Sequence, residues 1–171
     1  MGRPYQETGV TMRRMNAVAS VLFKVAMIAA ATVPAANAAP AGDACALLTP
    51  AEVGAALGVP VGAGAYVTPT FKRTCTWTAT WSGGGIVTLL LQDVSGFDGG
   101  KRLARMGGKD TSLTPVSGLG DDAYLLALGT QVGLTIKKGR VAFKVALYAE
   151  MPVARKEATE KAIARQVAAR L

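Results

Sequence analysis

The side chains of this sequence that could do chemistry are few, and their types exclude most kinds of active site. The sequence contains no histidine. Histidine is the usual general base near neutral pH and the commonest metal ligand, so Ser-His-Asp and Cys-His arrangements are excluded with it. Ser117 has Asp121 and Lys137 as conceivable helpers, but it lies in neither a Gly-x-Ser-x-Gly elbow nor a Ser-x-x-Lys motif. We therefore expect a protein that is not an enzyme.

Carboxylates and glycines offer no stronger site. Asp121 and Asp122 are adjacent at the start of an expected strand, so their side chains point to opposite faces and do not form an acid and base pair. The aspartates of the chain do not have the alternating spacing of a calcium-binding loop. The glycine-rich segments 83–85 and 118–120 lead into strands rather than helices, which predicts turns and not phosphate-binding loops. We expect no metal and no cofactor.

The N-terminal segment predicts that the protein is exported. Arg13 and Arg14 precede an apolar stretch that ends in Ala36-Asn37-Ala38, which has the basic head, apolar middle and small-residue cleavage site of a secretory signal. The uninterrupted apolar run, 25–33, is nine residues long, whereas a membrane-spanning helix needs roughly 20. We predict a signal peptide over 1–38 and a mature chain over 39–171 in the periplasm or outside the cell. The alternatives are an uncleaved amphipathic anchor and a start at Met12 or Met15, which would give a more ordinary signal.

Cys45 and Cys75 are the two cysteines of the chain. In an oxidising compartment such a pair is most simply interpreted as one structural disulfide, which would stabilise the fold by roughly 3 to 4 kcal/mol in the chain-entropy model. Lipid attachment at Cys45 is the alternative. Asp43, two residues before Cys45, disfavours the small and apolar box that lipoprotein processing needs. We expect the disulfide.

The densest group of charges is basic and is a candidate contact site. From residue 39 onward the chain has 15 Lys and Arg against 10 Asp and Glu, a net charge of about +5. Lys137, Lys138 and Arg140 fall at an expected hairpin tip, and Lys144 falls on the exposed phase of the next strand. Basic surfaces attract anionic partners, and for an exported protein that partner is an anionic envelope component rather than nucleic acid. The alternative is a solvated tip whose charges limit aggregation.

Trp77 and Trp81 could form an aromatic floor for a ligand. Both share the apolar phase of one expected strand with Cys75, and buried aromatic side chains supply much of the apolar area of a core. We therefore expect both tryptophans in the core, next to the disulfide.

Capping residues, alternation and turns predict the elements that must position these side chains. Thr49-Pro50-Ala51-Glu52 forms a capping box that starts a helix, and Gly58 ends it. Residues 74–81 alternate strictly between threonine and apolar side chains, and 82–85 is a turn to the partner strand. The expected elements are helices at 50–57, 97–106 and 153–171 and strands at 65–71, 73–81, 86–93, 123–128, 131–138 and 141–149, with a polar loop at 110–122.

The expected order is therefore helix, three strands, helix, three strands, helix. Tight hairpins and one-sided strands indicate an antiparallel sheet of about five or six strands with helices packed on it, which is an α+β fold in a single domain. The last helix presents an apolar stripe to the sheet, which includes Val153, Ile163, Val167 and Leu171.

Two segments resemble a known family. The opening Cys45-Ala46-Leu47-Leu48-Thr49-Pro50-Ala51-Glu52-Val53, followed by Leu57-Gly58 and Cys75-Thr76-Trp77, is similar to that of a large family of small exported bacterial domains of unknown function, many of them lipoproteins. The later Gly118-Leu119-Gly120-Asp121-Asp122-Ala123-Tyr124 resembles that family's second recurring segment. The resemblance implies a disulfide between the first helix and the tryptophan-bearing strand, and it carries no enzyme activity. In contrast to a lipoprotein, this chain has no separate lipobox cysteine before Cys45.

The sequence as a whole favours an exported, non-enzymatic domain that binds a protein or an anionic envelope component. The alternative is a periplasmic or secreted carrier of a small apolar ligand. A flat, partly apolar exposed surface would favour a protein partner, whereas a large apolar pocket with convergent polar groups would favour the carrier.

Overall fold

The computed structural model of the protein describes residues 42–81 and 83–171. The predicted signal peptide, 1–38, and its cleavage site lie outside these residues. The described elements, in chain order, are the 3-10 helix η1 (Cys45–Leu47), α1 (Pro50–Leu57), β1 (Ala65–Thr68), β2 (Phe71–Thr78), β3 (Ile86–Asp93), α2 (Val94–Met106), β4 (Thr111–Pro115), β5 (Asp122–Leu128), β6 (Gln131–Lys138), β7 (Val141–Tyr148) and α3 (Val153–Ala168).

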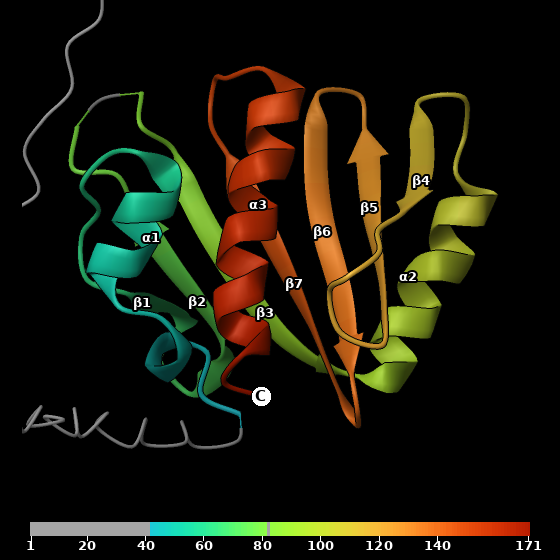
Figure 1. The fold of residues 1–171 in the computed structure, drawn as a ribbon, viewed down its shortest axis with the longest axis horizontal. Helices are drawn as coiled ribbons and strands as arrows, with labels where there is room; N and C mark the ends of the chain where they lie inside the picture. Colours follow the sequence, from blue (N-terminus) through green and yellow to red (C-terminus); the bar gives the residue numbers. More distant parts are fainter. Residues whose placement is uncertain (1–41, 82) are drawn as a thin grey trace, which may run out of the picture. The chain divides into compact units, whose positions relative to one another are not determined.

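All the named strands form one antiparallel sheet in the order β1-β2-β3-β7-β6-β5-β4 (Figure 1). Strands β1 to β3 make one meander and β4 to β7 make a second. Between the two meanders, α2 carries the chain from β3 to the far edge of the sheet, where β4 begins. The second meander then returns until β7 pairs with β3 along its whole length, from Ile86↔Tyr148 to Asp93↔Val141. The β3 and β7 pair therefore joins the two halves of the domain.

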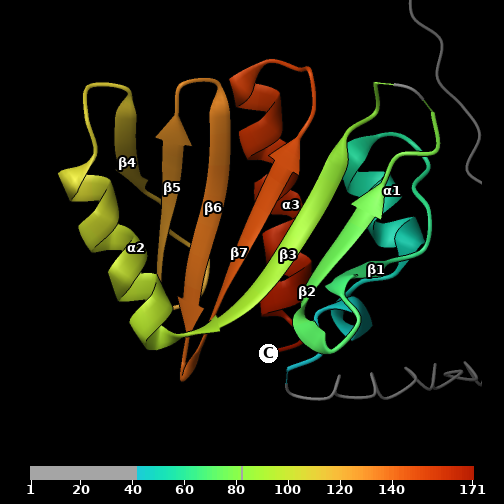
Figure 2. The ribbon, with the colours of Figure 1, turned by 180° about the vertical axis from the view of Figure 1, so that it is seen from behind.

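The helices cover the two faces of the sheet unequally. Helices α1 and α3, with η1, lie on one face, and α2 lies on the other face, where it contacts β4 and β6 and also β3 and β7 (Figures 1 and 2). We call the first face the helix side. Its core includes Phe143, Val145 and Leu147 of β7, which pack with Ile163 and Val167 of α3. A smaller cluster of Phe97, Tyr124 and Ala142 lies between α2 and the opposite face.

Local sequence signals explain where the first two helices start. Thr49 Oγ1 accepts a hydrogen bond from the Glu52 amide at 3.3 Å, and Glu52 Oε2 accepts one from the Thr49 amide at 2.8 Å, which completes the predicted capping box. Gly58 ends α1 with φ +82°, a conformation that favours glycine. Helix α2 begins three residues earlier than predicted, because the Asp93 carboxylate caps it by accepting from the Gly96 amide at 3.0 Å.

The helix side is further held together by Arg170, just beyond α3. Its guanidinium donates to both carboxylate oxygens of Glu52 on α1 and to the Leu47 carbonyl of η1. The hydrogen bond from Arg170, helped by the Thr49 donors at the cap, lowers the pKa of Glu52 to about 2. This charged contact therefore joins α1, near the start of the described residues, to the segment that follows α3 at the C-terminal end.

The α+β class and the antiparallel sheet are as predicted, but the sheet has seven strands rather than five or six. The additional strand is β4, which lies in the segment predicted as a polar loop. Its one large apolar side chain, Leu113, packs against the α2 cluster, and Pro115 is tolerated because β4 is an edge strand. A five-residue strand with this composition has too weak an alternation to be recognised.

The predicted disulfide is present in the structure. The sulfur atoms of Cys45 and Cys75 are 2.00 Å apart, so that η1 is joined to β2. Cys75 and Trp77 are fully buried on the helix side, as expected. Trp81 is different: its residue is 56% exposed. The expectation of a core position for Trp81 is wrong because β2 ends at Thr78, and only an isolated bridge at Ala79 continues the pairing.

Candidate functional site

Two of the polar residues considered for catalysis, Asp121 and Asp122, have structural partners in the fold. The Asp121 carboxylate accepts a hydrogen bond from the Gly139 amide at 2.7 Å and so stabilises the turn between β6 and β7. The Asp122 carboxylate forms a salt bridge with Lys101 of α2 at 2.5 Å. Ser117 is exposed in the loop after β4. Within 42–81 and 83–171, no three Cys, Asp or Glu side chains gather in a way that could hold a metal ion.

The four predicted contact residues do not form one patch. Lys137 is paired with Ala142, which belongs to the α2 face of the sheet. Lys138, the next residue, points to the helix side, where its ammonium donates to the Ala168 carbonyl at the end of α3. Alternation along β6 therefore separates the two lysines, and Lys138 stabilises a helix C-terminus. Arg140 is exposed at the turn, and Lys144 shares the α2 face with Lys137.

A part of the α2 face carries no helix and is a candidate contact surface. Figure 2 shows β2, β3 and β7 on this face with no helix in front of them. Three residues of each strand point to this face. The strand pairing aligns them in three rows that run across the strands, with one residue from each strand in each row. We call these nine residues the open face: Thr74, Thr76, Thr78, Ile86, Thr88, Leu90, Lys144, Ala146 and Tyr148.

The open face combines hydroxyl groups with exposed apolar side chains. Ile86 and Tyr148 are a cross-strand pair at one end, and they are 40% and 51% exposed. Thr76 and Thr88 form the pair in the middle row. Cross-strand pairs of this kind bring side chains within about 5 Å of one another, so the rows form a continuous surface. Of the nine residues, only Ala146 is buried.

Lys144 lies at the border of the open face, above a glycine. A Cβ placed on Gly133 of β6 would be 2.7 Å from Cε of Lys144 and 3.4 Å from its Nζ. The missing side chain of Gly133 therefore leaves room for the lysine to lie flat across β6. The open face thus has an ammonium group at its border with β6, next to the neutral rows.

On the helix side, α3 contains a buried acid that sequence analysis missed. Glu160 is fully buried, its Oε1 accepts from the Leu147 amide at 2.9 Å, and its Oε2 has no hydrogen-bond partner among the described residues. Burial raises the pKa of Glu160 to about 7, although the Leu147 amide and the nearby Lys144 and Lys156 act in the opposite direction. The sequence contains a signal for the burial of Glu160. Glu160 precedes the apolar residues Ile163 and Val167 by three and seven residues, which is the spacing of residues on one face of a helix.

Lys156 occupies the same inward stripe of α3 one turn before Glu160. It is 3% exposed, and its ammonium donates to the Thr130 carbonyl at 3.1 Å. Val153 and Leu171, which were expected on the apolar stripe, are instead 38% and 39% exposed. The stripe toward the sheet is therefore shorter and more polar than predicted.

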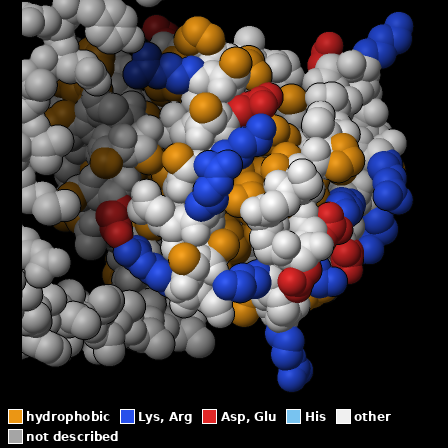
Figure 3. All heavy atoms as spheres, in the orientation of Figure 1, with side chains coloured by type: hydrophobic (Ala, Val, Ile, Leu, Met, Phe, Trp, Pro, Cys, Tyr) orange, Lys and Arg blue, Asp and Glu red, His pale blue; other side chains and the backbone are white. Residues whose placement is uncertain are grey.

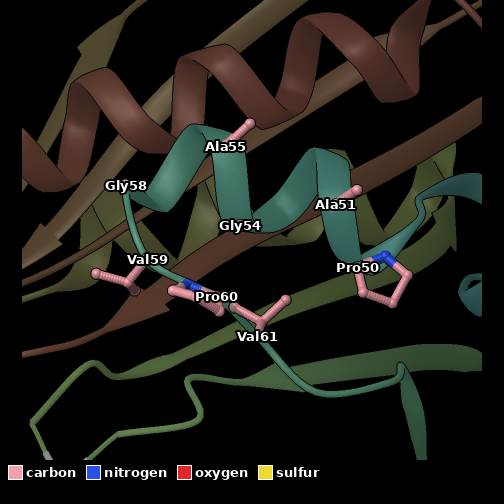
Figure 4. A pocket seen from close by; sticks show the side chains of 8 residues that line it. All are labelled: Pro50, Ala51, Gly54, Ala55, Gly58, Val59, Pro60 and Val61. Carbon is pink, nitrogen blue, oxygen red and sulfur yellow. The ribbon is translucent and has the colours of Figure 1, made fainter.

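Among the hollows on the helix side, two have a mostly apolar lining that bears on ligand binding. The first, of about 510 Å³, runs along the outer side of α1, and Figure 4 shows that it is lined by small and apolar side chains such as Ala55 and Val61. The second is an apolar cleft of about 430 Å³ between Leu91, Val141 and Leu171, with Arg73 in its lining. The Arg73 Nε is buried and has no hydrogen-bond partner among the described residues.

Comparisons with known proteins leave the chain without a family: no family model matches it, and neither a curated protein nor a solved structure is significantly similar to it. In the part of the chain that the structure describes, no helix is long and apolar enough to cross a membrane.

Proposed function

We propose that the protein is an exported, non-enzymatic binding protein, and that its open face contacts another protein of the cell envelope. The observation that supports this proposal is the unequal covering of one sheet. Strands β2, β3 and β7 are packed under helices on the helix side, whereas their other face presents exposed Ile86 and Tyr148. Export is the part of the proposal that rests on the sequence pattern of residues 1–38.

The chemistry of the open face suits a protein partner. Tyrosine and exposed aliphatic side chains are typical of the centre of protein interfaces, and threonine hydroxyls can donate and accept hydrogen bonds at its polar parts. Lys144 at the border adds a preference for a partner with an acidic group at the matching position. The surface is a regular grid of strands rather than a pocket, and small ligands need a concave site that buries most of their surface.

The proposal can be tested by site-specific photocrosslinking in the native cell envelope. A photoreactive residue replaces Thr88 in the middle of the open face, and in a matched control it replaces Ala51, which is exposed on α1. The expected result is one defined crosslinked protein from position 88 that is absent from position 51. The crosslink should disappear when Ile86 and Tyr148 are both changed to Ser. Crosslinks that are the same from both positions would contradict the proposal.

The cleft at Arg73 favours a second function, the carrier of a small apolar ligand. Its volume of about 430 Å³ and its apolar lining fall within the range of small-molecule sites. The unpartnered Nε of Arg73 could bind the anionic head of such a ligand. Native mass spectrometry of the protein from its own cells distinguishes the two functions. A bound small molecule that is lost in Leu171→Arg, a change in the cleft lining at a residue that is 39% exposed, would favour the carrier, and ligand-free protein would favour the open face.

A further inference from the structure

We infer that the exposed side of α2 is a docking surface for an anionic phospholipid bilayer. We call this surface the α2 edge: it consists of Arg102, Leu103, Arg105, Met106 and Lys109. Leu103 is 70% exposed and Met106 is 82% exposed, the two highest values among the large apolar residues of the described chain. Three basic residues lie between or beside them in the sequence.

The orientation of α2 explains why these apolar side chains are exposed. The helix packs on the sheet through Phe97 and Ala104, which are 1% and 8% exposed. At about 100° per residue, Met106 lies on the opposite side of the helix from Phe97, with Arg102 and Leu103 on either side of it. Two apolar side chains therefore point away from the only sheet that α2 contacts, which packing within the domain does not explain.

The surroundings extend the apolar surface at the end of α2. The Gly129 amide donates to the Asp110 carbonyl at 3.1 Å, so the turn between β5 and β6 lies beside the segment that follows α2. That turn carries Leu128, which is 55% exposed. Figure 1 places α2 at the outer end of the sheet, and Figure 3 shows Lys and Arg side chains along this end of the molecule.

The basic groups of the α2 edge are available to a partner. Lys101, on the inner side, is bound to Asp122 and lies 4.8 Å from the Phe97 ring centroid. Arg102, Arg105 and Lys109 take part in none of the salt bridges between described residues. These three cations surround apolar side chains on a helix surface, as in amphipathic helices that bind at the lipid headgroup layer. Each cation near an anionic bilayer adds to the attraction.

A bilayer fits this surface better than a protein partner does. Leu, Met and long basic side chains on the outer side of α2, at the edge of the sheet, form a projecting surface, which a headgroup layer can accommodate by local insertion. A protein would need a complementary groove. The inference is independent of the open face, because that surface lies over β2, β3 and β7. The domain could then bind a protein while it rests on a membrane.

The test is sedimentation of the full exported protein with vesicles. Vesicles of phosphatidylglycerol and phosphatidylcholine in equal parts are compared with pure phosphatidylcholine vesicles. We expect binding to the anionic vesicles that is at least tenfold stronger, and that weakens as salt rises because screening shortens the reach of the cations. Leu103→Ser with Met106→Ser, and separately Arg102→Gln with Arg105→Gln, should each weaken binding at least fivefold.

Matched controls keep the result specific to the α2 edge. Val67→Ser removes a side chain that is 63% exposed on β1, at the other end of the sheet, and Arg155→Gln removes an exposed cation from α3. Both should bind vesicles as the wild type does. All variants share one N-terminus, so differences between them report α2 alone. Equal binding to both kinds of vesicle, or unchanged binding by both α2 double variants, would overturn the inference. Neither outcome affects the crosslink from Thr88.

Discussion

The two faces of strands β2, β3 and β7 differ in composition, burial and covering, although the same strands supply both. On the helix side, Trp77, Leu89 and Leu147 are fully buried under η1, α1 and α3. On the open face, one residue further along each strand, Thr78, Leu90 and Tyr148 remain at least partly exposed. Alternation therefore separates the side chains that stabilise the core from those of the proposed contact surface, so that a single substitution can affect one set without the other.

The largest effect should come from adjacent leucines on opposite faces. Leu89→Ala removes a fully buried side chain and should lower the free energy of unfolding by roughly 3 to 5 kcal/mol. Leu90→Ala makes the same chemical change on the open face, where the side chain is only half-buried, and should cost about 1 kcal/mol or less. Urea unfolding measures both. Similar losses would show that the two faces contribute equally to the core.

Removal of the disulfide should weaken only the helix side. Cys45→Ala with Cys75→Ala releases a link between residues that are 30 apart in sequence. The chain-entropy model gives a loss of about 3 to 4 kcal/mol in unfolding free energy. The open face does not include the disulfide, so the crosslink from Thr88 should persist in the folded fraction. Loss of that crosslink in a variant that remains folded would show that the two faces are coupled.

Glu160 predicts a dependence of stability on pH. Its pKa is raised from 4.5 to about 7 in the folded state, so the folded protein holds a proton that the unfolded chain has already lost between these values. The contribution of Glu160 to the free energy of unfolding should therefore be fully present below about pH 4.5 and fall by about 3 kcal/mol as the pH rises to about 7. Glu160→Gln should remove this part of the pH dependence. Unfolding by urea at several pH values measures it, and an unchanged profile in the variant would contradict the assignment.

The smallest effect should come from the adjacent lysines of β6. Lys138→Gln removes the ammonium that donates to the Ala168 carbonyl on the helix side, and it should cost about 0.5 to 1 kcal/mol. Lys137→Gln changes a partly exposed side chain on the other face and should stay within about 0.5 kcal/mol of the wild type. Thermal unfolding of the two variants compares them. A larger loss in Lys137→Gln would reverse the order that alternation predicts.

Sequence analysis could predict those parts of the fold that depend on local chemistry. The capping box at Thr49, the glycine at the end of α1 and the alternation of β6 and β7 give the bounds of these elements almost to the residue. The covering of the two faces depends instead on where α2 crosses the sheet. No local pattern contains this information, so the uncovered position of Ile86 and Tyr148 could not be predicted in the same way. Trp81 is exposed for a different reason, because β2 ends before the alternation of its sequence does.

For the candidate site, too, local patterns predict the phase of single residues but not which residues lie side by side. The sequence identified Lys144 from its phase in a strand, and the structure places it at the border of the open face. It also grouped Lys138 with Lys137, which alternation separates. Ile86 and the threonines of β2 have ordinary strand patterns, and their neighbourhood becomes visible only when β3 pairs with both β2 and β7.

If the open face is the contact surface, as proposed, Tyr148 should contribute to the affinity for the partner. Tyr148→Ala removes a side chain that is 51% exposed on the open face, and Leu128→Ala removes one that is 55% exposed at the turn between β5 and β6. Calorimetry with the protein crosslinked through position 88 should give a dissociation constant at least tenfold higher for Tyr148→Ala, because truncation of a central interface tyrosine often costs about 2 kcal/mol and about 1.4 kcal/mol is tenfold. Leu128→Ala should bind that protein as the wild type does. Equal affinities for wild type and Tyr148→Ala would contradict the claim.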